Sequence, residues 1–166
     1  MPSAGDYQVF ESTAGTASNW DPTIQHGSPP LALMTKAIEE VAELASTNLR
    51  IGRLALDILG AIPVAPVKVR AWVDRPGARI SLMSAEMLAE RTDGTDRAVA
   101  RVHAWLLGTS DTSDVAMNRY PPLVEGEGMP NAHDWAGNPG YLETVTWRTQ
   151  ASVTGEPAVV WLSPLV

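Results

Sequence analysis

The sequence predicts an α+β domain in which one apolar helix is wrapped by a curved antiparallel sheet. Residues 31–44 carry apolar side chains at the spacing of an amphipathic helix. Between residues 49 and 107, four runs alternate apolar and polar side chains with the period of two that strands require. The runs are long, roughly 8 to 12 residues against an average strand of about 5 to 6. Consecutive strands beside one buried helix are typical of an α+β arrangement.

The N-terminal segment leads to the helix through a loop. Residues 7–12 favour a short strand, and residues 15–22 indicate a loop. Asp21 stands before a proline in this loop, a pairing that favours a turn. We therefore expect one strand and one irregular stretch before the helix.

The helix should begin at Ser28, which is followed by Pro29 and Pro30. A serine side chain can cap free amides, and a proline at the first helical position loses a donor that had no partner. The first two turns are apolar almost all round, whereas charges gather in the C-terminal half. The start of the helix should therefore be enclosed and its end should emerge into solvent.

Four strand-like runs follow the helix, at residues 49–60, 67–74, 80–90 and 97–107. Turn signals separate them, Arg-Pro-Gly at residues 75–77 and Thr-Asp-Gly at residues 92–94. The alternation of the third run is imperfect, which suggests a hidden bulge. Small side chains would let the sheet approach the helix and curl round it: Ala71, Ala98, Ala100 and Ala104.

The C-terminal part has a different composition. Residues 111–140 are rich in Gly, Pro, Asp, Ser and Asn and indicate a long connector. Residues 141–150 and 158–162 are strand-like again. Two isolated strands are at best marginally stable, so this segment adds to the first sheet, pairs with another chain, or begins a second domain.

Composition limits the partners. The net charge of −7 argues against nucleic acid, because phosphate neutralisation needs clustered Lys and Arg. The chain has no cysteine, which fits a reducing compartment. Neither a signal peptide nor an apolar run of about 18 residues is visible. The default expectation is a cytoplasmic protein without a membrane span.

Residues 19–22 (Asn-Trp-Asp-Pro) and 25–33 (Gln-His-Gly-Ser-Pro-Pro-Leu-Ala-Leu) resemble the acyl-CoA thioesterase-like families of actinobacteria. The resemblance extends to Trp105, about the first 110 residues, and the tail resembles the opening of a second repeat. These families are double-hotdog proteins, similar in plan to the thioesterase II group. The resemblance thus implies a hotdog domain at 1–110, a connector at 111–140, and the first strands of a second, incomplete hotdog repeat at 141–166.

The resemblance also implies hydrolysis of acyl-CoA thioesters. In the thioesterase II group the catalytic Asp, with its Thr and Gln partners, belongs to the second hotdog, and no residue of this chain corresponds to it. Position 28 is serine, where glycine is commoner in the family pattern.

Three residues at the helix start are the catalytic candidates, His26, Gly27 and Ser28. Amides at a helix N-terminus can stabilise the oxyanion that develops on a thioester carbonyl, and glycine permits close approach. His26 could act as a base or contact the thioester. The alternatives are a tight, capped helix start and an imidazole bonded to nearby backbone.

Four neighbours are the substrate-binding candidates: Asn19, Trp20, Asp21 and Gln25. Asp21 is more often a turn former than a base in such a position. His103 should face outward or lie at a sheet edge, and His133 with Asp134 lies in the expected connector. The histidines are too scattered for a metal site, and no cofactor fingerprint is present. The six tryptophans are expected in the core and at interfaces.

Three functions remain open at this point. The first is an acyl-CoA thioesterase, and the second is a protein that binds acyl-CoA or another acyl thioester without hydrolysing it. The third is an enoyl-CoA hydratase, which would need a positioned Asp-His pair that the sequence does not offer. Hotdog domains usually pair along a sheet edge, so either a homodimer or an internal double-hotdog pair is expected.

Overall fold

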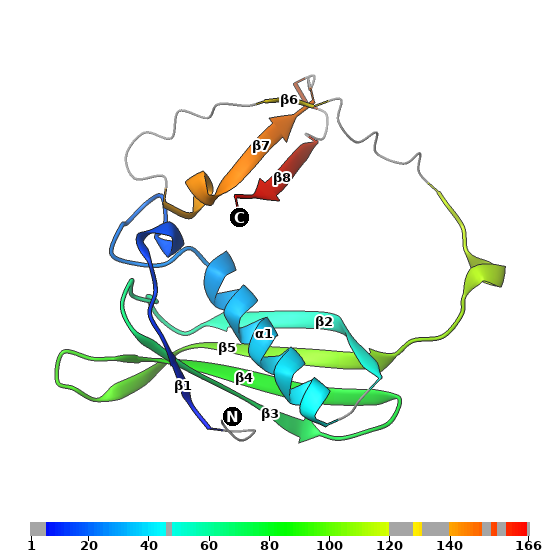
Figure 1. Ribbon diagram of the computed structural model, residues 1–166, viewed down its shortest axis with the longest axis horizontal. Helices are drawn as coiled ribbons and strands as arrows, with labels where there is room; N and C mark the ends of the chain where they lie inside the picture. Colours follow the sequence, from blue (N-terminus) through cyan, green and yellow to red (C-terminus); the bar gives the residue numbers. More distant parts are fainter. Residues whose placement is uncertain are drawn as a thin grey trace.

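A five-stranded antiparallel sheet forms the body of the domain, in the order β1-β3-β4-β5-β2 (Figure 1). The computed structural model describes residues 6–45, 48–119, 128–130, 140–150, 154–155 and 159–165. The strands are β1 (Gln8–Phe10), β2 (Leu49–Ile58), β3 (Val67–Arg75), β4 (Ile80–Glu90) and β5 (Asp96–Gly108). All five strands predicted from the alternation and the turn signals are confirmed.

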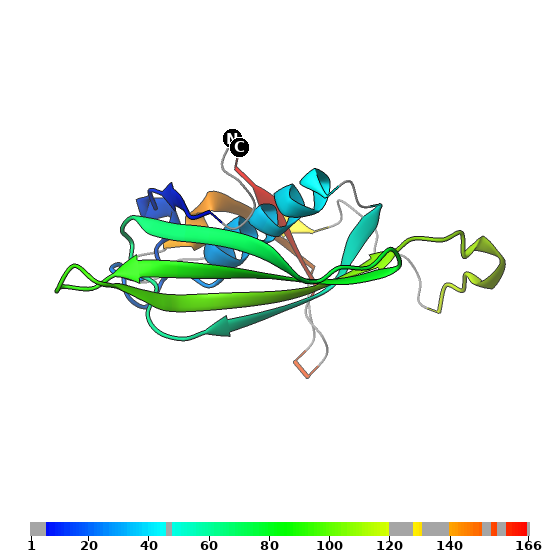
Figure 2. The same ribbon diagram turned by 90° about the horizontal axis from the view of Figure 1, so that it is seen from below.

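Helix α1 (Ser28–Leu44) lies across one face of this sheet, as Figure 2 shows from below. It packs mainly on β3 and β4 and less on β5. Met34 and Ile38 have no exposed surface, and they meet strand residues as small as Ala71 and Ala100. The predicted α+β architecture is therefore confirmed. In the part of the chain that the structure describes, no helix is long and apolar enough to cross a membrane.

The bulge suggested by the third run is present, but its extra residue belongs to the neighbouring strand. Met87 pairs with Ala100 and Leu88 pairs with Ala98, which leaves Val99 of β5 without a partner on β4. A bulge bends the strand and increases its twist. It therefore helps the sheet to curve round the helix.

The sheet face away from α1 carries a polar layer centred on Glu86, of which 7% is exposed. Tyr7 donates to its Oε1 at 2.9 Å, and Arg70 donates to the same oxygen at 3.1 Å. Arg101 donates to Oε2 from Nε and Nη2, at 3.0 and 2.9 Å. Burial raises the pKa of Glu86, but these hydrogen bonds and the Arg101 charge lower it by more, so the pKa is below its ordinary value.

A second polar row lies beside it on the same face. Ser84 is hydrogen-bonded to Asp74, and its Oγ lies 2.8 Å from Nδ1 of His103. Trp72 donates from Nε1 to Asp74 at 2.7 Å. His103 is exposed on the outer face, as expected.

The described strands of the C-terminal segment pair with one another and not with the first sheet. They are β6 (Met129–Pro130), β7 (Val145–Thr149) and β8 (Val160–Pro164), which form their own antiparallel sheet. Residues 141–144 were expected in a strand, but they continue the 3-10 helix η3 (Gly140–Thr144). η3 packs against the 3-10 helix η1 (Ala14–Thr16) at the upper left of Figure 1. A further 3-10 helix, η2 (Ser113–Val115), lies in the stretch where a connector was predicted.

The tryptophans depart from expectation. Trp20 is 66% exposed, and the other four described tryptophans are half-buried: Trp72, Trp105, Trp147 and Trp161. None of these five lies in the buried core, and interface positions for them stay a prediction. The core is built from smaller side chains, because alanines and valines of the sheet lie under the helix.

Candidate functional site

The start of α1 has a different cap from the one the sequence predicts. Gly27 is the N-cap residue, Ser28 is already helical, and no side-chain cap bond comes from either. Capping by Ser28 is therefore wrong. The acceptor is Nδ1 of His26, which lies 3.3 Å from the backbone nitrogen of Ser28. The cap comes from a side chain that precedes the helix.

Few backbone N–H groups at this helix start are available to a ligand. Pro29 and Pro30 have no N–H, and the Leu31 N–H donates to the Gly27 carbonyl at 3.3 Å. The N–H of Gly27 has no acceptor among the residues that the structure describes. A helix N-terminus carries a partial positive charge. Gly27 therefore offers the donor best able to bind an oxyanion.

His26 is held on several sides. Its backbone N–H donates to the Thr16 carbonyl at 2.8 Å. Its ring stacks with that of Tyr141, with centroids 5.0 Å apart, and is tilted against Trp20 at 5.6 Å. Because Nδ1 accepts from Ser28, the neutral imidazole carries its proton on Nε2. In that form His26 is a hydrogen-bond donor.

Gln25 orders the loop. It is 8% exposed, its N–H donates to the Ile62 carbonyl at 2.7 Å, and its Nε2 donates to the Pro63 carbonyl at 2.8 Å. Its backbone also bridges to Ala17. These bonds fix the segment that presents His26 and Gly27.

Of the three remaining candidates, Asp21 forms a turn, whereas the side chains of Asn19 and Trp20 are available to a ligand. Asp21 Oδ1 accepts from the N–H and the hydroxyl of Thr23, at 2.8 and 2.7 Å. Those bonds lower the pKa of Asp21, as in a stable turn. Asn19 is half-buried and Trp20 is exposed. Neither side chain has a hydrogen-bond partner within the described ranges.

An uncovered apolar surface adjoins the free amide. A Cβ placed on Gly27 would lie 3.8 Å from Cδ1 of Ile58. Ile58 is 58% exposed and Leu54 is 36% exposed, and both project from edge strand β2 toward the helix side of the sheet. Leu59 follows and is 52% exposed. The site thus joins a backbone donor to an apolar wall.

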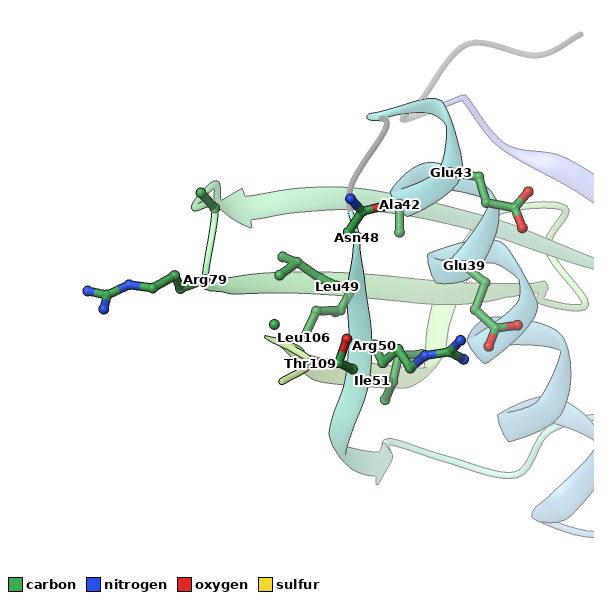
Figure 3. Close-up of a pocket in the computed structure, with 12 residues that line it drawn as sticks. Glu39, Ala42, Glu43, Asn48, Leu49, Arg50, Ile51, Arg79, Leu106 and Thr109 are labelled. Atoms are coloured by element: carbon green, nitrogen blue, oxygen red, sulfur yellow. The ribbon is translucent and has the colours of Figure 1, made fainter. Parts of the chain in front are cut away.

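A pocket with a volume of about 960 Å³ lies at the other end of α1 (Figure 3). Helix residues Glu39 and Glu43 line it, about 16–22 Å along the axis from Ser28. Arg50 of β2 extends toward the helix, while Arg79 points away (Figure 3). None of the predicted site residues lines this pocket. It is separate from the candidate site.

Two contributors were not predicted. Ile58 was expected in the strand, but not beside Gly27. Tyr141 was expected in a strand, yet its ring lies on His26. The only nearby signal was the Asn-Pro-Gly turn sequence at residues 138–140, and Gly140 has a φ of +50°. His133 and Asp134 lie outside the described residues.

The comparisons with known proteins agree on the fold. A family model described as the acyl-CoA thioesterase N-terminal domain matches residues 16–107. No curated protein matches the sequence. Similar solved structures include an acyl-CoA hydrolase from Agrobacterium tumefaciens, with 20% identity and a TM-score of 0.54. That match covers 66% of this chain and 44% of the Agrobacterium protein, so this chain spans under half of its length.

Two further structures are similar over a comparable part of the chain. The hexameric thioesterase from Yersinia pestis has 13% identity and a TM-score of 0.53, over 67% of this chain and 92% of its own. The acyl-CoA hydrolase from Staphylococcus aureus, solved with butyryl coenzyme A and coenzyme A, has 12% identity and a TM-score of 0.54. That match covers 64% of this chain and 66% of the other. With its helix on a curved antiparallel sheet and the family match over residues 16–107, the chain belongs to the acyl-CoA thioesterase N-terminal domain family and has the hotdog fold.

Proposed function

We propose that this domain binds acyl-CoA thioesters and takes part in their hydrolysis, with the thioester carbonyl oxygen accepting from the N–H of Gly27. One observation carries the proposal. The Gly27 amide stands at a helix N-terminus with no acceptor among the described residues, beside the exposed side chain of Ile58. A carbonyl joined to an alkyl chain needs a donor of this kind next to an apolar wall.

The chemistry needs two halves, a polarised carbonyl and an activated water. Gly27 polarises the carbonyl, and His26, the preceding residue, presents Nε2–H as a further donor to the substrate. Asp21 is a poor base near neutral pH, because its bonds from Thr23 lower its pKa. The water-activating carboxylate then comes from a second hotdog unit.

The substrate's two ends meet different surfaces. The acyl chain lies over Ile58 and Leu54, whose exposed apolar area it covers. The exposed ring of Trp20, which lies 5.6 Å from the His26 ring, and the nearby Asn19 amide, which has no partner among the described residues, contact the pantetheine arm. Such a substrate places the protein in lipid metabolism, and the lack of cysteine is compatible with the cytoplasm.

The unpaired edge of β2 suggests how the second unit joins. β2 ends the sheet order and pairs only with β5 among the described strands. A long edge strand is a site for pairing with another chain. A second copy, or an internal second hotdog, would continue the sheet there. Sedimentation should give a homodimer for this 166-residue chain, and a strict monomer would contradict it.

The alternative is binding without turnover. Asp21 is the one acidic residue between positions 16 and 31, and it is engaged in its turn. A domain that polarises the thioester carbonyl but activates no water would bind an acyl-CoA without hydrolysing it.

A chain-length panel of acyl-CoAs separates the two. Release of free thiol on at least one substrate supports hydrolysis. A thermal shift with acyl-CoA and no thiol release supports binding alone. Absence of both, across short, medium and long chains, would overturn both versions of the proposal.

A further inference from the structure

Tyr141 brings the C-terminal segment into contact with the candidate site. Tyr141, in η3, stacks its ring on His26 with a centroid distance of 5.0 Å and an interplanar angle of 25°. The two residues are far apart in the sequence, so the contact joins the C-terminal sheet to the start of α1. We propose that Tyr141 is a positioning residue, which holds the His26 imidazole in the orientation that caps Ser28 and completes the thioester site.

The backbone around Tyr141 shows that the contact is built into the fold. The N–H of Tyr141 donates to the Ala17 carbonyl at 2.8 Å. Ala17 is buried and bridges to Gln25, the residue directly before His26. The anchor of Tyr141 and the backbone that presents the imidazole are therefore parts of one hydrogen-bonded unit.

Gly140 allows this close approach. Its φ is +50°, in the region that favours glycine, and a Cβ there would lie 2.2 Å from the Ala17 carbonyl oxygen. The 3-10 helices η3 and η1 also touch, since a Cβ on Gly15 would lie 3.1 Å from Cγ2 of Thr144. No side chain larger than hydrogen fits at position 140 without moving the segment away.

The orientation of the His26 imidazole determines whether the Ser28 N–H at the start of α1 has its acceptor. An imidazole free to rotate would leave the Ser28 N–H without its acceptor, because that bond needs Nδ1 in one place, 3.3 Å away. Stacked rings are worth about 0.5–1.5 kcal/mol. At 1.4 kcal/mol per tenfold, removing the Tyr141 ring should change the occupancy of the capped arrangement roughly 2- to 12-fold. This inference rests on the proposed function only for its catalytic consequence.

The test compares Tyr141→Leu with Tyr141→Phe, which keeps the ring. The readouts are the His26 imidazole resonances, identified by their loss in His26→Asn, and the exchange rate of the Ser28 amide. Neither needs acyl-CoA, so they report on Tyr141 even if the proposed function fails. We expect Tyr141→Leu to shift the resonances and speed the exchange roughly 2- to 12-fold, and Tyr141→Phe to resemble the wild type.

Two further variants exclude a general loosening. Trp161→Leu weakens the C-terminal sheet without touching His26 and should leave both readouts unchanged. Gly140→Ala keeps the Tyr141 ring but displaces its backbone, and should reproduce Tyr141→Leu. If acyl-CoA is hydrolysed, Tyr141→Leu should lower kcat more than it raises KM. Unchanged His26 resonances in Tyr141→Leu, or equal changes in Trp161→Leu, would overturn the inference.

Discussion

Nδ1 of His26 accepts a hydrogen bond from the backbone N–H of Ser28, at 3.3 Å, and so takes the place of the missing side-chain cap of α1. The bond fixes three things at once: the proton of the neutral imidazole on Nε2, the direction of the ring, and the first amide of the helix. Gly27 lies between them, and its own N–H has no acceptor in the described part of the chain.

Replacing His26 should expose this cap. In His26→Phe the ring can still stack with Tyr141, but the acceptor is gone, so the fold should lose about 0.5–1.5 kcal/mol. His26→Asn is the matched variant, because asparagine is a good acceptor near helix starts. Urea unfolding and exchange of the Ser28 amide measure the difference. Equal stability and exchange in the wild type and His26→Phe would show that the bond contributes nothing.

The polar layer on the outer face should matter for stability. Glu86→Gln removes the charge that faces Arg70 and Arg101, and the fold should lose about 1–3 kcal/mol. The low end applies if both guanidinium groups, which are partly exposed, stay hydrated. Glu90→Gln, at the exposed end of the same strand, is the control. Urea unfolding that gives the two variants the same stability would contradict the role of Glu86.

The lowered pKa of Glu86 should make the free energy of unfolding depend on pH. The pKa of Glu86 is lowered from its ordinary 4.5, because the bonds from Tyr7, Arg101 and Arg70 outweigh the effect of burial. A carboxylate with a lowered pKa stabilises the fold fully above 4.5, and this contribution is lost as the pH falls through the folded-state value. The stability gap between wild type and Glu86→Gln should therefore be constant near neutrality and narrow below pH 4.5. A stability difference between the two proteins that grows below pH 4.5 would contradict the stabilising role of the Glu86 carboxylate.

Ile58 should control how affinity depends on acyl chain length. Burial of one methylene is worth about 0.8 kcal/mol, so wild-type affinity should improve by at most roughly fourfold per added methylene. Ile58→Asn should flatten this dependence, while Ile80→Asn, on an exposed isoleucine of β4, should keep it. Calorimetric titration across the chain-length series gives the slope of affinity against chain length for each of the three proteins. Parallel slopes for all three proteins would remove Ile58 from the site.

Sequence patterns predicted the sheet closely because alternation and hairpin turns are local signals. The runs from residue 49 to residue 107 became β2 to β5 with ends that differ by two residues or fewer. The cross-strand row of Arg70, Glu86 and Arg101 depends instead on register, which is set when strands pair. The sequence shows the charges, but not that they meet.

The start of α1 was likewise predicted only in part from the sequence. Ser28, Pro29 and Pro30 located α1 correctly, yet the cap came from His26, since the helix begins one residue earlier than a serine cap needs. The stacking of Tyr141 on His26 could not be predicted, because no periodic signal links two short segments so far apart in the chain.

A proline at position 27 tests whether the Gly27 N–H binds the thioester carbonyl. Gly27 has a φ of −65°, which proline adopts, and its N–H has no acceptor among the described residues, so Gly27→Pro removes one donor and no internal bond. Gly27→Ala keeps the N–H, and its Cβ meets Ile58 at an ordinary 3.8 Å.

The measurement is acyl-CoA affinity and hydrolysis by the two variants, with circular dichroism to show that both keep the helix. We predict that Gly27→Pro binds roughly 2- to 12-fold more weakly and, where thiol is released, that its kcat falls by about 10²–10³. Gly27→Ala should stay close to the wild type in both. A folded Gly27→Pro protein that matches Gly27→Ala in affinity and turnover would contradict the account.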